Sequence, residues 1–213
     1  MYLDRMMRHG LDWLIKAHPE PSTLYVQIGS AAVDNNYWGG DQGIPNPRQS
    51  YVINSTAPGT DAAASAAAAF AASSVLYSGT PLATTSSAYS PPASIVNATY
   101  AQILLSHAKD LYDFANTTTR QVYQTNVPAV KGVYASSGWQ DEMVWGGLWM
   151  ALATNNSAYY ADALSLYQSA KLTPVDKVLN WDSEFYAAIY TPPGSEGGRA
   201  EGMERQGPFD ALR

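Results

Sequence analysis

The sequence predicts an all-α domain. Several stretches carry either apolar residues at helical spacing or an excess of alanine, and long loops rich in Gly, Pro, Asn and aromatic residues separate them. Only residues 23–28 have the β-branched and aromatic composition of a strand. A length of 213 residues with 46% hydrophobic content is enough for one globular core.

The N-terminal segment predicts a helix over residues 2–17 and then a short strand. Apolar residues recur at helical spacing from Leu3 to Ile15. The sequence His18-Pro19-Glu20-Pro21 ends this helix, because proline lacks an amide hydrogen and restricts the residue before it. Residues 23–28, followed by glycine, form the predicted strand.

Residues 29–59 are rich in Gly, Pro and Asn and are expected to form a loop. A loop of about thirty residues is uncommon in a compact domain unless it has a function, so it is either a binding loop, which we favour, or it hides an element. Thr60 and Asp61 can cap the next helix, which runs to about Tyr77. Alanine dominates this helix and permits close packing, so we expect it to be buried.

The second half of the chain predicts more helices, joined by a surface connection rich in Ser, Thr and Pro over residues 78–98. These helices are expected over residues 101–115, 143–153, 159–170 and 183–190. Residues 1–190 would make up the domain. Residues 191–213 are charged, glycine-rich and without periodicity, and are expected to be a disordered tail.

Charge and hydropathy exclude several classes of partner. A net charge of −6 without any Lys/Arg cluster argues against nucleic acid as a partner. No apolar stretch is long enough to predict a membrane span. From Pro21 to Ala108 the only Asp, Glu, Lys or Arg residues are Asp34, Asp41, Arg48 and Asp61. Such an uncharged surface suits neutral sugars. His18 is expected to be a packed or capping residue, and His9 and His107 are expected to lie alone on helices.

The sequence carries mixed signals about secretion. Met1 opens directly onto an amphipathic segment, which is not a signal peptide. Glycosylation sequons favour a secreted eukaryotic protein, and they begin at Asn54, Asn97, Asn116 and Asn155. We therefore expect an extracellular parent protein whose targeting segment is not part of this sequence.

The segment from Asp34 to Asp41 combines carboxylates and aromatic residues. The two aspartates flank Tyr37-Trp38-Gly39-Gly40, so a carboxylate pair could border an aromatic platform for a sugar, and hydrolysis of glycosides uses two carboxylates. Alternatively, both aspartates cap turns and Trp38 packs on the domain surface.

A second segment, residues 136–146, places Asp141 and Glu142 side by side at the start of a predicted helix. The positive end of the helix dipole attracts such charges without any ligand. However, Ser137 and Gly138 precede them, and Ca²⁺ is bound by carboxylates together with carbonyl and hydroxyl oxygens. Both interpretations stay open on these residues alone.

These two segments, together with Asn180-Trp181-Asp182, resemble glycoside hydrolase family 9, the endoglucanases that cut β-1,4-glucans. Further matching segments follow in the same order, so the resemblance covers about residues 2–190. They are Leu14–Pro19, Tyr25–Gly29, Pro45–Tyr51 and Pro58–Ala63. The resemblance implies an (α/α)6 barrel with inner and outer rings of helices, of which this chain would contain about half.

The resemblance also implies ligands. Family members show an Asp-His-x-aromatic-Trp-Gly pattern in the substrate cleft, which places Asn35 at the histidine position; an amide can bond a sugar hydroxyl but does not titrate. The implied binding residues for cellulose or cello-oligosaccharides are Asn35, Trp38, Tyr134, Trp139 and Trp181. Packing against a neighbouring helix is the alternative for Tyr134 and Trp139. A structural Ca²⁺ would be bound by Ser137, Gly138, Asp141, Glu142 and Asp182.

The mechanism that the resemblance implies is inverting, with a carboxylate base and a carboxylic acid about 6.5–9.5 Å apart. Neither the family's Asp-x-x-Asp-Tyr motif nor its C-terminal acid has a match, so no catalytic residue is assigned. We expect a truncated endoglucanase domain with weak or no activity. The alternative is a non-catalytic glucan-binding or helical interaction domain.

Overall fold

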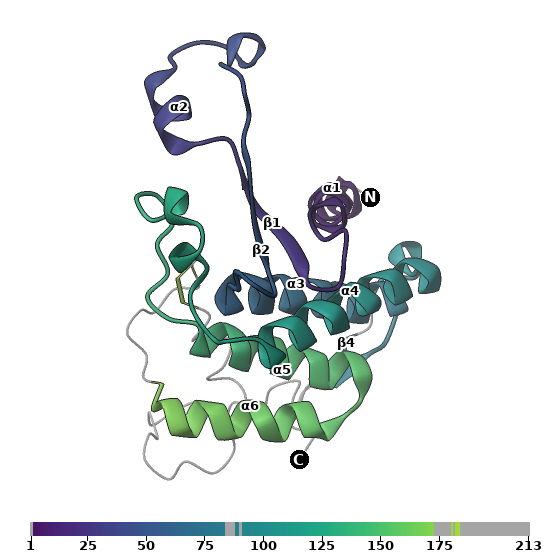
Figure 1. Ribbon diagram of the computed structural model, residues 1–213. Coiled ribbons are helices and arrows are strands. Elements are labelled where there is room, and N and C mark those ends of the chain that lie inside the picture. Colours follow the sequence, from purple (N-terminus) through teal and green to yellow (C-terminus); the bar gives the residue numbers. More distant parts are fainter. Residues whose placement is uncertain (1, 84–87, 90, 173–179, 181, 184–213) are drawn as a thin grey trace, which may run out of the picture.

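The structure is a computed structural model that describes residues 2–83, 88–89, 91–172, 180 and 182–183. Helices dominate it, as the sequence predicts. The long ones are α1 (Tyr2–Ala17), α3 (Thr60–Ser78), α4 (Ala98–Thr117), α5 (Gln140–Thr154) and α6 (Ser157–Ala170). Figure 1 shows α3 to α6 packed together, with α1 standing apart at one side. No described helix is long and apolar enough to cross a bilayer.

Helix α3 lies at the centre of the core and packs against both α4 and α5. Four of its alanines, Ala63, Ala64, Ala67 and Ala71, are 0% exposed, and their methyl side chains let neighbouring helices approach closely. The expected cap is wrong in detail: Gly59 is the N-cap, and it makes no side-chain capping bond. Thr60 instead bonds the loop before α5, with its Oγ1 accepting from the Gln121 amide at 3.0 Å.

The predicted strand β1 (Thr23–Ile28) is confirmed, and it pairs with a strand that the sequence analysis missed. This strand, β2 (Ser50–Asn54), runs antiparallel to β1 with Leu24 opposite Ile53 and Ile28 opposite Ser50. The expectation of one continuous loop over residues 29–59 is therefore wrong. The segment between the strands also contains α2 (Ala31–Asn36) and a 3-10 turn, Asp41–Gly43.

The surface connection over residues 78–98 also contains more structure than expected. Strand β3 (Leu82–Ala83) pairs antiparallel with β4 (Ala88–Tyr89), and a 3-10 turn follows at Ala93–Ile95. Almost all of the candidate helix over residues 183–190 and the whole of the expected tail over residues 191–213 lie outside the described residues.

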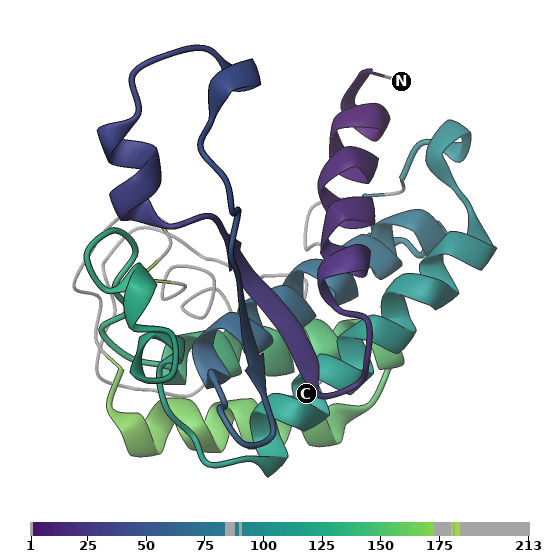
Figure 2. The same cartoon turned by 45° about the horizontal axis from the view of Figure 1, so that its top comes forward.

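Helix α1 contacts the rest of the molecule both through apolar residues, with Leu11 buried in the core, and through polar side chains. The hydroxyl groups of Tyr77 and Tyr100 donate to Asp4 at 2.9 Å and to Asp12 at 2.7 Å, respectively. The Arg8 guanidinium lies 4.3 Å from the Tyr100 ring centre and 5.0 Å from that of Tyr77, within the range of a cation–π interaction. Several of its apolar residues are exposed, namely Leu3, Met6 and Trp13. Figure 2 shows α1 as an upright helix beside strands β1 and β2.

Two histidines meet where α1 ends against α4. His18 is buried, as expected, but His107 is not alone on its helix: its Nδ1 lies 2.7 Å from Nδ1 of His18. At that distance one imidazole donates a proton and the other accepts it. The His107 ring also stacks on Phe70 of α3. Burial lowers the pKa of both histidines, and the nearby Asp110 carboxylate only partly opposes this effect.

Candidate functional site

A pocket of about 630 Å³ opens between β1, the N-terminus of α3 and the loop that precedes α5. Four aromatic residues line it, namely Trp13, Tyr25, Tyr123 and Tyr134. Its neutral hydrogen-bonding residues include Gln27, Asn35 and Ser136, and its acidic residues are Asp34, Asp61 and Glu142. The combination of aromatic faces, neutral amides and acids is typical of a site for a polar, uncharged ligand.

Glu142 is the most perturbed acid of the pocket. It lies in the first turn of α5, only 2% exposed, and its Oε2 has no hydrogen-bond partner. Burial, with smaller contributions from the neighbouring carboxylates of Asp141 and Asp61, raises the pKa of Glu142 to about 10. Such a group is protonated at neutral pH unless a cation compensates its charge. The helix dipole alone therefore does not account for this glutamate.

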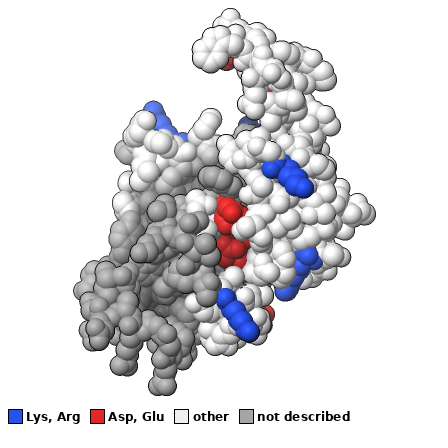
Figure 3. Space-filling model, turned by 90° about the vertical axis from the view of Figure 1, so that its left-hand side faces the viewer, with Lys and Arg blue, Asp and Glu red and all other residues white. Residues whose placement is uncertain are grey.

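Asp61 resembles Glu142 in its surroundings. It is buried at the start of α3, where its Oδ1 accepts from the Tyr123 amide at 2.8 Å, while its Oδ2 has no partner. Burial raises the pKa of Asp61, and bonds from Ser136 and nearby backbone amides oppose the increase. Two buried carboxyl groups, each with one oxygen unsatisfied, thus line the same pocket. Figure 3 shows that other acidic side chains reach the surface in the middle of one face of the molecule.

The structure brings together distant parts of the predicted calcium site. The Ser137 amide donates to Oδ1 of Asp182, which is 45 residues further along the chain. The Asp182 amide in turn donates to Oδ1 of Asn180 at 2.9 Å. The unsatisfied oxygen of Glu142 and the oxygen-only donor set fit a hard cation. Among the described residues no three acidic or histidine side chains form a metal cluster, so backbone and hydroxyl oxygens would have to complete the shell.

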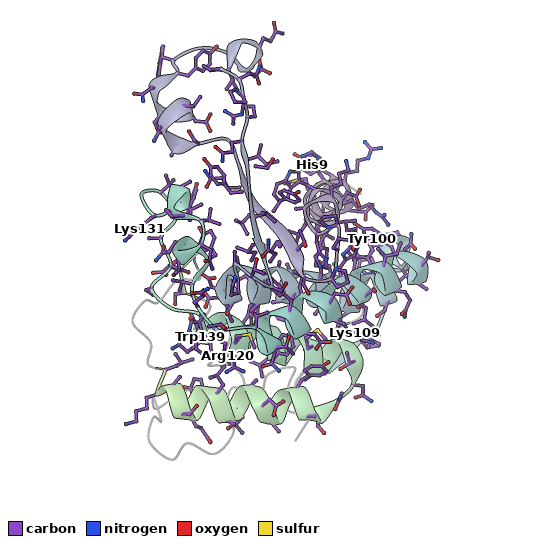
Figure 4. All side chains as sticks on the ribbon, viewed as in Figure 1. His9, Tyr100, Lys109, Arg120, Lys131 and Trp139 are labelled. Carbon is purple, nitrogen blue, oxygen red and sulfur yellow. The ribbon has the colours of Figure 1, made fainter. Side chains whose placement is uncertain are left out.

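The predicted sugar-binding residues are only partly brought together. Asn35 and Tyr134 line the pocket, and both are exposed. Trp38 is 101% exposed beside α2 and does not line the pocket, so the alternative that it packs on the domain surface is wrong. Trp139 packs against the core at the N-terminus of α5, with the Arg120 guanidinium 5.2 Å from its ring centre (Figure 4). Trp181 lies outside the described residues.

Asp34 and Asp41 do not form a pair in the pocket. The Asp34 carboxylate accepts two bonds from the Arg48 guanidinium, which holds the pKa of Asp34 below its ordinary value. Asp41 is exposed in the 3-10 turn and does not line the pocket. The alternative that the Asp34 side chain caps a turn is also wrong, because Ser30 caps α2 and Asp34 instead contacts Arg48.

Several residues that line the pocket were not predicted to bind a ligand, among them Asp61 and Tyr123. The contact of Arg48 with Asp34, beside the pocket, was not predicted either. Arg48 had one signal, because it is the only cation between Pro21 and Ala108 and two aspartates precede it. Asp61 had another, as a lone acid at the start of an alanine-rich helix. Tyr123 stands in no motif.

Comparison with known proteins gives a consistent result. Residues 1–194 match the model of the family described as Glycosyl hydrolase family 9. Endoglucanase 13 of Arabidopsis thaliana is 36% identical over 184 residues, which cover 86% of this chain and 33% of that protein. The chain thus spans about a third of the length of this curated relative.

Solved structures agree with the fold. The endoglucanase of the termite Nasutitermes takasagoensis superposes with a TM-score of 0.76 at 32% identity, covering 88% of this chain and 39% of that one. Endoglucanase CelQ of Clostridium thermocellum, complexed with cellobiose and cellotriose, gives a TM-score of 0.65 at 25% identity, covering 88% and 28%. The predicted fold class is confirmed: the helices match part of an (α/α)6 barrel.

Proposed function

Because this chain belongs to glycosyl hydrolase family 9, we propose that it is part of an endoglucanase of the inverting type. We propose that it binds β-1,4-glucan in the pocket beside β1. The observation that carries this proposal is the pocket itself, whose exposed aromatic residues and neutral amides match the faces and hydroxyl groups of a glucose unit. The names of the relatives, endoglucanases from plants, bacteria and a termite, support cellulose or its oligosaccharides as the ligand.

The described residues contribute to binding more than to bond cleavage. Tyr134 presents an exposed ring at the pocket, and the Asn35 amide can both donate to and accept from sugar hydroxyls. The carboxyl groups are poorly placed to act as the acid and the base. Asp61 and Glu142 are buried, and Asp34 is held by Arg48. Inversion requires a carboxylate that activates water and an acid that protonates the leaving oxygen. We propose that neither is among the described residues.

The test compares binding with turnover. Purified chain is titrated calorimetrically with cellotetraose and is incubated with a soluble cellulose derivative, with released reducing ends as the readout. We expect binding that weakens in Asn35→Ala and Tyr134→Ala, with little or no release. Release that Asp34→Asn abolishes would show instead that the described acids catalyse. No binding at all would reject the proposed function.

Because Asp61 and Glu142 are buried and poorly placed for catalysis, a second candidate role is non-catalytic binding of glucan. This role and the first share the pocket and differ only in turnover. If cellotetraose binds and no reducing ends appear even at high protein concentration, the binding role is the better description of this chain.

We further propose a structural Ca²⁺ bound by Ser137, Gly138, Asp141, Glu142 and Asp182. The unsatisfied Glu142 Oε2 and the contact of Ser137 with Asp182 support it. Since a ligand that binds only the native state stabilises it, Ca²⁺ should raise the melting temperature of chelator-treated protein. The increase should be lost in Asp182→Asn and kept in the control Asp41→Asn, whose carboxylate is exposed on a turn. A melting temperature that does not respond to chelator or to Ca²⁺ would reject the site.

We also propose that the parent protein is extracellular. Support comes from the exposure of the sequon residues Asn97, Asn116 and Asn155 on the surface. Secretory expression in a eukaryotic host should give a product whose electrophoretic mobility changes after enzymatic removal of N-glycans. An unchanged mobility would remove this support.

A further inference from the structure

The segment between β1 and β2, residues 29–49, forms an arm that projects from the helical core (Figure 1). Backbone bonds hold its base: the Gly29 amide donates to the Gln49 carbonyl at 2.7 Å, and the Gln27 side chain donates to the Gly29 carbonyl at 2.9 Å. At its tip the Tyr37 hydroxyl donates to the Gly40 carbonyl at 2.9 Å. Neither α2 nor the 3-10 turn of the arm contains a buried residue. Apolar packing therefore does little to fix the arm's shape.

One ion pair crosses the arm above its base. The Arg48 guanidinium donates from Nη1 to Oδ1 of Asp34 and from Nη2 to Oδ2 at 3.2 Å, so it grips both carboxylate oxygens. Gly29 has φ +85°, and a Cβ at that position would overlap the same guanidinium. The backbone at Gly29 thus leaves room for the pair. Because the residues are 14 apart in sequence, the contact ties α2 to the start of β2.

The two partners differ in their relation to the pocket. Asp34 and its neighbour Asn35 line the pocket, whereas Arg48 does not. Arg48 contacts Asp34 but does not line the pocket. It can therefore affect a bound molecule only through Asp34.

We propose that Arg48 is a positioning residue: by gripping Asp34 it holds α2, and with it Asn35, at the mouth of the pocket and so sets the affinity for β-1,4-glucan. This inference rests on the proposed function. It predicts that Arg48 variants loosen the arm and weaken binding together.

The expected effect is modest, because both side chains of the pair are partly exposed and salt screens their attraction. A two-point contact to a carboxylate is stronger than a single one, which favours arginine over lysine. We expect Arg48→Gln to weaken cellotetraose binding about threefold to fivefold, the range of an exposed ion pair coupled to binding. Arg48→Lys should weaken it less.

The experiment measures two quantities on each protein. Calorimetry gives the affinity for cellotetraose at low and high salt, and limited digestion with chymotrypsin gives the cleavage rate at Tyr37 and Trp38 without any sugar. The control is Lys109→Gln, which removes an exposed charge from α4, away from the arm (Figure 4). We expect Arg48→Gln to be cleaved faster and to bind more weakly, Arg48→Lys to be intermediate, and the control to match the parent. High salt should reduce the difference in cellotetraose affinity between the parent and Arg48→Gln, because salt screens the ion pair in the parent.

Other outcomes overturn the inference in distinct ways. Weaker binding with unchanged cleavage would mean that Arg48 contacts the sugar directly. Faster cleavage with unchanged affinity would mean that the arm's shape does not affect the site. Parent protein that binds no cellotetraose would reject the proposed function, and Arg48 would then hold the arm without serving glucan binding.

Discussion

The block formed by α3, α4 and α5 and the arm over residues 29–49 are stabilised in different ways. In the block, alanines and larger apolar residues such as Leu104 and Leu111 are fully buried between helices. In the arm, α2 and the 3-10 turn bury nothing, and a few hydrogen bonds with one ion pair define the shape. The block should therefore tolerate few changes of volume, while the arm should respond to changes of charge and hydrogen bonding.

This difference also explains where the candidate site lies. The pocket takes its rigid wall from the buried starts of α3 and α5, which carry Asp61 and Glu142. Its variable wall comes from the arm and from the loop before α5, which carry Asn35 and Tyr134. Ligand contacts on loops beside a packed scaffold are a common arrangement.

The largest effect should come from a cavity in the block. Leu104 of α4 is 0% exposed, whereas its neighbour Ile103 is 44% exposed. We expect Leu104→Ala to lower the free energy of unfolding by about 3 kcal/mol, as typical for a buried leucine. Ile103→Ala should cost less than about 1 kcal/mol. Urea denaturation of both variants measures the contrast, and equal losses would mean that α4 is not packed as described.

A smaller effect should come from two helical glycines with opposite surroundings. A Cβ at Gly147 of α5 would lie 2.8 Å from the Tyr112 hydroxyl and 3.0 Å from Cβ of Ala163, whereas one at Gly10 of α1 would meet nothing within 4 Å. We expect Gly147→Ala to destabilise by about 1 to 2 kcal/mol through overpacking. Gly10→Ala should stabilise by about 0.5 kcal/mol through helix propensity. Thermal melts distinguish the two signs, and stabilisation by both would show spare room beside α5.

A pH-dependent effect should come from the imidazole pair at the edge of the block. Because burial lowers the pKa of His18 and His107, the folded state favours neutral rings. Their stabilising contribution is therefore present above the ordinary value of 6.5 and is lost as pH falls below it. We expect the parent to lose roughly 1 kcal/mol between pH 7.5 and 5, a small value because solvent still screens the pair. The His107→Gln variant should lose less stability than the parent over the same pH range.

The control for this measurement is His9→Gln, since His9 is exposed on α1. Its stability should follow the parent at each pH. If His107→Gln and the parent show the same pH dependence in denaturation experiments, the imidazole pair does not sense pH.

The smallest effect on stability should come from the arm. Trp38 is fully exposed, so Trp38→Ala should leave the free energy of unfolding within about 0.5 kcal/mol of the parent. If the ring stacks on glucan, as the family resemblance implies, the affinity for cellotetraose should fall about threefold to tenfold. Loss of stability would contradict the exposed position, and unchanged affinity would remove Trp38 from the binding surface.

Local signals explain what the sequence predicted well. The bounds of α1 and β1 were predicted because prolines separate them, and α3 because alanine fills it. The predicted start of α4 is three residues late, because the sequence does not reveal that the Asn97 side chain caps this helix by accepting from the Tyr100 amide. Strand β2 was missed because its partner β1 lies more than twenty residues earlier, and pairing at that range leaves no periodicity inside a segment rich in Gly and Pro.

The site divides in the same way. Asn35, Tyr134 and Glu142 stood in segments with a family pattern, and the structure brings all three to one pocket. Asp61 lies in the matching segment Pro58–Ala63 without having been assigned a role in binding, and Tyr123 stands in no motif. The Tyr123 amide, in the loop before α5, donates to Oδ1 of Asp61, a contact that only the folded chain reveals. The predicted calcium and sugar contacts of all these residues stay predictions.

The alanine content of α3 also limits which sequences can occupy that helix. Helices α4 and α5 both pack against it, and alanines such as Ala63, Ala64, Ala67 and Ala71 are fully buried in that helix. At such positions glycine weakens the helix and any larger residue separates the layers, so serine remains as nearly the only exchange. Randomised libraries of α3 should therefore yield few folded variants, whereas equally diverse libraries of the arm should yield many.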